Sequence, residues 1–105
     1  MNAVFREVSV PGCVYGYSSM LHIAVGANEQ PPDGYSWGES APPVPPVEMP
    51  GDVGHALRLG MINEGVDLMG GGMMVSSAHT LADVEATIEA FRRTLHAMKD
   101  DGVLR

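Results

Sequence analysis

The residues of this chain whose types and spacing come nearest to a catalytic arrangement are Ser76, Ser77 and His79. A serine hydroxyl beside an imidazole suits nucleophilic catalysis, because the ring can accept the hydroxyl proton. The three residues lie where the sequence predicts a junction between a strand and a helix, and side chains so close in sequence are not expected to turn toward each other there. Neither serine is flanked by the glycines of a nucleophile elbow. We therefore predict no hydrolytic site and no catalytic residue in this chain.

His79 has two other interpretations. It can be a polar residue at the mouth of a pocket, or a side chain that bonds the neighbouring backbone and shapes the junction. The four histidines do not form a pair at the close spacing of a helical zinc site, so we expect no metal centre. They are His22, His55, His79 and His96.

The glycines at 70–72 could in principle approach a phosphate. The run lacks the spacing and the following lysine of a phosphate-binding loop, and no helix begins directly after it. A flexible pivot between two extended segments is the simpler interpretation.

The formal net charge of −7 opposes binding to nucleic acid, which requires clustered Lys and Arg. No segment has the length of a transmembrane helix, so we expect no membrane partner. Cys13 is the single cysteine and cannot form an internal disulfide, and no apolar leader follows a basic start. These features predict a cytoplasmic location.

The first part of the chain is expected to form a hairpin over residues 3–25. Valines alternate from Val4 to Val10, Pro11 and Gly12 supply a turn, and Cys13 to Val25 is rich in β-branched and aromatic residues. Beside the second strand stand polar and sulfur-containing side chains that either line a ligand site or satisfy a sheet edge. They are Tyr15, Tyr17, Ser18, Ser19 and Met20.

Residues 26–51 contain every proline except Pro11. Proline removes a backbone donor and restricts the residue before it, so we expect a long loop that is disordered or depends on a partner. Tyr35 and Trp37 are its large aromatic residues.

Residues 52–102 are expected to form a helix, a strand and a second helix. Asp52 is the expected cap of a helix that ends at Gly65, and Met73 to Ser77 form the strand. Thr80 and Asp83 match a capping box at the start of the last helix. An apolar stripe runs along that helix at helical spacing; it consists of Leu81, Val84, Ile88, Phe91, Leu95 and Met98.

This order predicts a single α+β domain over residues 1–105, with a small antiparallel sheet and two helices on one face. Several ordered motifs resemble the carboxy-terminal small domain of class III pyridoxal-phosphate-dependent aminotransferases, in the branch of glutamate-1-semialdehyde aminomutase. They are Ala56-Leu57-Arg58-Leu59, Asn63-Glu64-Gly65-Val66-Asp67-Leu68 and Ser76-Ser77-Ala78-His79-Thr80, with a weaker match at Ser18-Ser19-Met20.

The resemblance implies the small domain of a fold-type I enzyme, which closes over the active site and contributes dimer surface. The cofactor pyridoxal phosphate and its Schiff-base lysine would belong to a large domain of the same enzyme, and the parent would be a homo-oligomer. Lys99 is the only lysine here, and it stands near the end of the last helix beside Asp100 and Asp101. A solvated, protonated amine cannot replace the catalytic lysine. We expect no cofactor and no activity in this chain alone.

The resemblance also makes Ser18, Ser19, Met20, Gly71 and His79 candidates for the substrate pocket. Gly71 stands where the aminomutases place a glutamate, and no arginine occurs between Arg58 and Arg92 to bind a substrate carboxylate. A parent transaminase of unspecified substrate is therefore favoured over an aminomutase. The alternative is a free-standing noncatalytic binding or oligomerisation module derived from the same domain.

Overall fold

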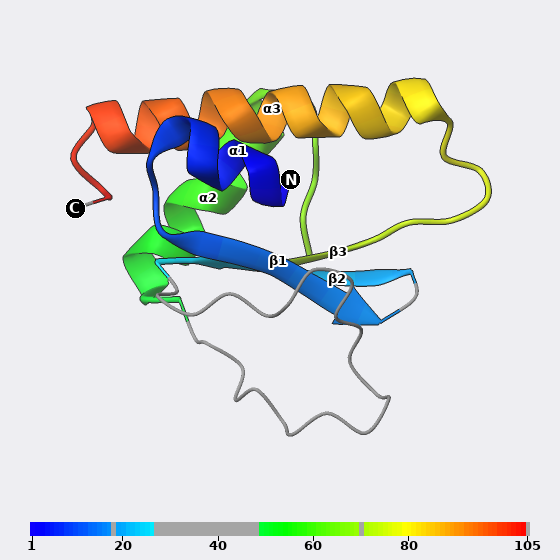
Figure 1. Cartoon of the computed structure of the whole chain (residues 1–105), viewed down its shortest axis with the longest axis horizontal. Coiled ribbons are helices and arrows are strands. Elements are labelled where there is room, and N and C mark those ends of the chain that lie inside the picture. The colour runs from blue at the N-terminus through cyan, green and yellow to red at the C-terminus, as the bar shows by residue number, and fades with distance from the viewer. Residues whose placement is uncertain (18, 27–48, 70, 105) are drawn as a thin grey trace.

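The computed structural model describes residues 1–17, 19–26, 49–69 and 71–104. Its strands form one antiparallel sheet in the order β1-β2-β3, and its helices α1, α2 and α3 lie on one face of that sheet (Figure 1). This confirms the α+β class with a small antiparallel sheet. Two of the helices were expected, and α1 is an additional one. The proposed loop, with Tyr35 and Trp37, lies mostly outside the described residues.

Helix α1 (Asn2–Val8) replaces the predicted first strand from Val4 to Val10, so that prediction was wrong. The buried side chains are Val4, Phe5 and Val8, whose spacing puts them on one side of a helix. Ser9 ends the helix in the left-handed conformation, with φ 57°. The alternation of valines favoured a strand locally, but packing of this helical face overrides that preference.

Two long-range contacts hold α1 in place. The Asn2 side chain donates to the Val14 carbonyl at 3.1 Å and accepts from the Val14 N–H at 2.7 Å. Lys99 donates from Nζ to the carbonyl of Val8 at 2.9 Å. The ammonium therefore satisfies the carboxyl end of α1 as well as lying in the last turn of its own helix.

The hairpin lies within residues 12–25 and not 3–25. Strand β1 (Gly12–Tyr17) pairs antiparallel with β2 (Met20–Val25), from Gly12 opposite Val25 to Tyr17 opposite Met20. Residues 13–25 were expected to form one strand that pairs with Val4 to Val10. Residues 2–8 form a helix, and the two strands of the hairpin both come from residues 12–25.

Strand β3 (Gly72–Met74) pairs antiparallel with β2 and is shorter than the predicted Met73–Ser77. Beyond it, the Val75 N–H still donates to the Ser19 carbonyl at 2.9 Å. A Cβ at Gly72 would lie 3.0 Å from the Leu21 carbonyl oxygen, so close approach of the two strands favours glycine.

Helix α2 (Gly51–Asn63) confirms the predicted helix but not its cap. Pro50 is the N-cap residue and makes no side-chain capping bond, whereas Asp52 lies inside the first turn. A carboxylate there still complements the positive helix end. After the helix, Gly65 adopts φ +91°, as its expected left-handed role requires.

Helix α3 (Leu81–Asp100) confirms the best-defined prediction, including both bonds of the capping box between Thr80 and Asp83. Its buried residues begin only at Ala90. There the ring of Phe91 meets the ring of Phe5 edge to face, with centroids 5.2 Å apart. Side chains from all three helices and from β2 join in one core.

Candidate functional site

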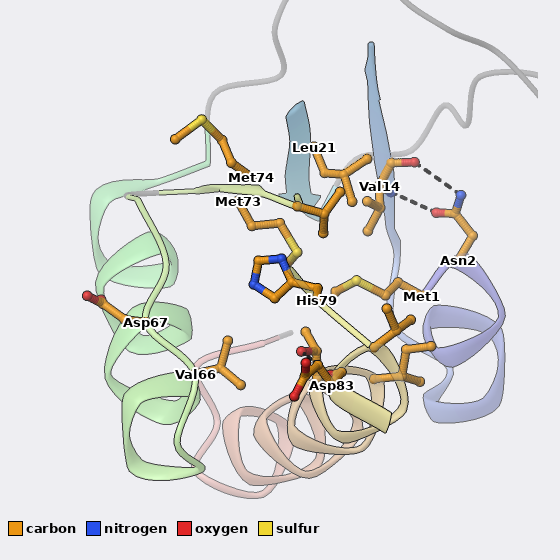
Figure 2. A pocket seen from close by; sticks show the side chains of 14 residues that line it. Met1, Asn2, Val14, Leu21, Val66, Asp67, Met73, Met74, His79 and Asp83 are labelled. Carbon is orange, nitrogen blue, oxygen red and sulfur yellow. Dashed lines mark hydrogen bonds between the residues drawn. The ribbon is translucent and has the colours of Figure 1, made fainter. Parts of the chain in front are cut away.

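A half-open cavity of about 420 Å³ lies between the sheet and the first half of α3 (Figure 2). Strands β1, β2 and β3, the segment after α2, the amino end of α1 and the first turns of α3 all contribute to it. Most of the lining side chains are apolar. The lining consists of Met1, Asn2, Val14, Leu21, Val66, Asp67, Met73, Met74, Val75, His79, Asp83, Val84, Thr87 and Ile88.

His79 stands in the middle of this cavity in Figure 2. Its Nδ1 accepts the backbone N–H of Ser76 at 2.9 Å and lies 3.4 Å from Ser76 Oγ. An Nδ1 that accepts an amide proton carries none itself, so the neutral ring has its proton on Nε2. The ring thus bonds the neighbouring backbone and also lines a cavity, so the structure contains the features of both interpretations of this residue.

The expectation that Ser76 and His79 cannot turn toward each other was wrong, since a tight turn brings them together. The His79 N–H donates back to the Ser76 carbonyl at 3.0 Å, and the Ala78 N–H donates to Ser76 Oγ at 3.3 Å. This small network closes the junction between β3 and α3. Because the same Nδ1 already accepts a backbone proton, the contact has the character of a turn and not of a nucleophile with its base.

The charged side chains of the cavity lining are Asp67 and Asp83, and Met1, which carries the α-amino group, also belongs to the lining. Asp83 Oδ2 accepts from the Thr80 N–H at 2.8 Å and from the Thr80 hydroxyl at 3.1 Å. The backbone bond, followed by the hydroxyl bond, lowers the pKa of the Asp83 carboxyl. Asp67 lies 3.8 Å from the Arg58 guanidinium, and both side chains are exposed. Among the residues that the structure describes, no side chain of Lys or Arg lines the cavity, and the two carboxylates disfavour phosphate and other anions.

The remaining polar side chains of the lining are already bonded to the backbone. Asn2 pairs with Val14 as described above, and the Thr87 hydroxyl donates to the Asp83 carbonyl at 2.8 Å. The cavity therefore offers an occupant mainly apolar contact, with the His79 ring and the two carboxylates as polar groups.

Of the five sequence-based pocket candidates, the structure puts only His79 in this cavity. Ser18 lies outside the described residues. Ser19 and the 53% exposed Met20 lie at the turn of the hairpin. Gly71 accepts the Ile23 N–H at 2.8 Å and lines a separate hollow beside the start of α2. The described candidates do not line one common cavity.

Sequence reasoning did not identify Val14, Leu21, Asp67 or Asp83 as cavity residues. Val84 and Ile88 were assigned to the apolar stripe of the last helix; both line the cavity, and Ile88 also packs against the core. The length of that stripe could have indicated that part of it stays uncovered, because it exceeds what a short sheet and two short helices can cover.

Comparisons with known protein families, curated proteins and solved structures found no match. Within residues 1–17, 19–26, 49–69 and 71–104, no three His, Cys, Asp or Glu side chains gather closely enough to hold a metal ion. No helix in the same ranges has the length and apolar character needed to cross a membrane.

The described residues do not fit pyridoxal phosphate. Lys99 is bound to the carbonyl of Val8, and the cavity contains acids where a phosphate would need cations. Any such cofactor would have to be held by residues other than the described ones.

Proposed function

We propose that this chain is the small carboxy-terminal domain of a pyridoxal-phosphate-dependent class III aminotransferase, a transaminase of the branch that includes glutamate-1-semialdehyde aminomutase. The observation that carries the proposal is the junction from β3 through His79 to the capped helix α3. There the residues that resemble the family motif, Ser76 to Thr80, stand beside an open cavity. A small domain that closes over an active site needs an open face of this kind.

In this proposal the large domain of the same enzyme holds the cofactor and supplies the Schiff-base lysine. The cofactor provides the electron sink of transamination when it is bound there. The residues of this chain exclude water through the apolar lining and position His79 at the edge of the closed site. The chain would also contribute dimer surface to a homo-oligomeric, cytoplasmic enzyme.

The experiment begins with the neighbouring coding sequence, where a large-domain reading frame is expected. The two parts, produced together with pyridoxal phosphate, should give a borohydride-reducible chromophore and transaminase activity, and neither should arise from this chain alone. Lys99→Ala should leave the chromophore of the joined enzyme unchanged, because Lys99 serves the end of α1. A chromophore in the isolated chain that is lost in Lys99→Ala would overturn the proposal.

The second candidate is a free-standing noncatalytic binding or oligomerisation module. The apolar, acid-lined cavity favours it, because such a surface can serve a partner without any cofactor. Absence of a large-domain frame beside this one, together with binding by the isolated chain, would support this candidate against the first.

A further inference from the structure

Helix α3 has an apolar stripe along its whole length but is buried along only half of it. Phe91, Leu95 and Met98 are buried at 0%, 0% and 4% exposure. On the same stripe Leu81 is 73% exposed and Val84 is 40% exposed. In Figure 1 the first half of α3 extends past α1 and α2, and the buried residues of α3 begin at Ala90.

The exposed half of the stripe continues into the cavity that contains His79. Val84 and Ile88 line the cavity from the helix. Met74 of β3 and Val75, the residue after β3, line it with exposures of 55% and 36%. We call this surface the α3 groove, which comprises the cavity and the adjacent Leu81. It is larger than the cavity, because Leu81 lies about one turn beyond Val84 on the same side of the helix.

The charged side chains that line the groove are acidic. Among the described residues, Asp67 and Asp83 line it and no side chain of Lys or Arg does; Met1, which carries the α-amino group, also lines it. Arg58, near Asp67, makes only a long, exposed ion pair at 3.8 Å. The whole chain carries a net charge of −7. An occupant with apolar side chains flanked by positive charges therefore matches the groove in both respects.

We propose that the α3 groove is a docking site for an amphipathic protein segment that carries apolar anchor residues flanked by Lys or Arg. A compact small molecule could fill the cavity but would leave Leu81 in water, whereas a helical segment lying along α3 covers both. A second copy of this chain that docked through the same groove would bring acidic residues against acidic residues. The inference concerns the same cavity as the proposed function, but it does not depend on the parent being an aminotransferase.

The test uses the full chain and a synthetic helical peptide of about four turns, with Leu along one face and Lys beside it. Two control peptides are used: one carries Glu in place of Lys, and the other carries the residues of the Lys peptide in scrambled order. Methionine methyl signals report the site: Met73 and Met74 line the groove, whereas Met61 and Met98 are buried in the core. We expect the Lys peptide to shift the first pair and leave the second unchanged, with weaker binding as salt is added.

Variants locate the binding surface. Val84→Lys removes an apolar contact and adds a repelling charge, so the Lys peptide should bind at least about tenfold more weakly. Ala86→Lys adds the same charge at an exposed position outside the lining and should change binding by less than about twofold. Asp67→Asn should weaken binding about two- to fivefold, and Asp100→Asn, at the far end of α3, should not.

Circular dichroism checks that each variant is folded. If Val84→Lys does not fold, the Asp67→Asn variant still tests the proposal, because Asp67 is exposed. Equal binding of the Lys and Glu peptides, or equal weakening by Val84→Lys and Ala86→Lys, would overturn the proposal. Shifts of Met73 and Met74 with protein concentration alone would identify a second copy as the occupant. A dissolved paramagnetic agent should broaden the methyl signals of the exposed Met69 and Met74 in the free chain. Broadening of the Met69 signal without that of Met74 would mean that another part of this chain fills the groove. Either of the last two results also rejects the proposal.

Discussion

His79 and Thr80 are adjacent at the entrance to α3 but have different tasks. The Thr80 hydroxyl accepts the Asp83 N–H at 3.2 Å and so satisfies an amide that the helix itself cannot. The His79 ring satisfies the Ser76 N–H in an exposed turn, where water can replace it. The difference between a helix cap and an exposed turn predicts different costs for losing the two side chains.

Thr80→Ala should lower the free energy of unfolding by about 0.5–2 kcal/mol, because the cap hydroxyl is lost. His79→Ala should cost less. Urea denaturation of the two variants beside the parent chain measures both. An unchanged midpoint for Thr80→Ala would rule out the cap as a source of stability, and a larger loss for His79→Ala would make the histidine the main structural residue of the junction.

Asp83 and Glu7 predict a decline of stability in acid. Bonds from Thr80 lower the pKa of Asp83, and the bond from the Arg92 guanidinium lowers the pKa of Glu7. A carboxyl whose pKa is lower in the folded state stabilises the fold fully above its unfolded pKa. That contribution is lost as the pH falls through the folded pKa. Urea midpoints measured from neutral to acidic pH should therefore fall less steeply in Asp83→Asn than in the parent, and parallel curves would contradict the assignment.

At the level of elements, α2 and α3 approach closely where Gly60 meets Thr94. A Cβ on Gly60 would lie 2.5 Å from Thr94 Cγ2, and Thr94 is 2% exposed. Its hydroxyl finds no hydrogen-bond partner among the described residues. A threonine side chain has few rotamers and cannot easily move away from an added Cβ. The close approach of the two helices therefore requires glycine at position 60.

Gly60→Ala should destabilise the protein by about 1–3 kcal/mol through overpacking, although alanine favours helix by up to about 1 kcal/mol. Gly54→Ala is the matched control in the same helix, because its Cβ would meet only Met49 Cε at 3.9 Å. It should stabilise by up to about 1 kcal/mol. Denaturation of both, and of Gly60→Ala combined with Thr94→Ala, provides the check: no partial recovery in the double variant would place the strain elsewhere.

For the whole molecule, α1 completes the core. Phe5 is 1% exposed and packs against Phe91, which lies far away in sequence and is also buried. The apolar residues at the other end of the molecule are left open to solvent around the α3 groove. Stability should therefore depend on the two apolar regions very unequally.

Phe5→Ala should cost about 3–5 kcal/mol, a large part of the total for a small domain. Leu81→Ala, at a 73% exposed position, should change stability by no more than about 0.5 kcal/mol. Urea unfolding followed by far-ultraviolet circular dichroism compares the two. A small loss for Phe5→Ala would contradict the packing of α1 in the core, and a large loss for Leu81→Ala would mean that the groove is covered in the free chain.

The sequence by itself determined the features whose causes lie within a few residues. The capping box needs only Thr80 and Asp83 one turn apart, and α2 and α3 follow from apolar residues at helical spacing. The positive φ of Gly65 follows from the end of α2 beside it. Of the candidate pocket, His79 could be named because its motif is also local.

Tertiary structure decided what depends on partners far along the chain. Val4 and Val8 satisfy both the spacing of a strand and that of a helix, but the burial of Phe5 together with them fits one face of a helix and not one face of a strand. The stripe of α3 is continuous in sequence, but its buried residues begin at Ala90, so Leu81 and Val84 are exposed and Val84 lines the cavity. Periodicity shows that a residue belongs to an apolar face; only the arrangement of the other elements determines whether anything covers that face.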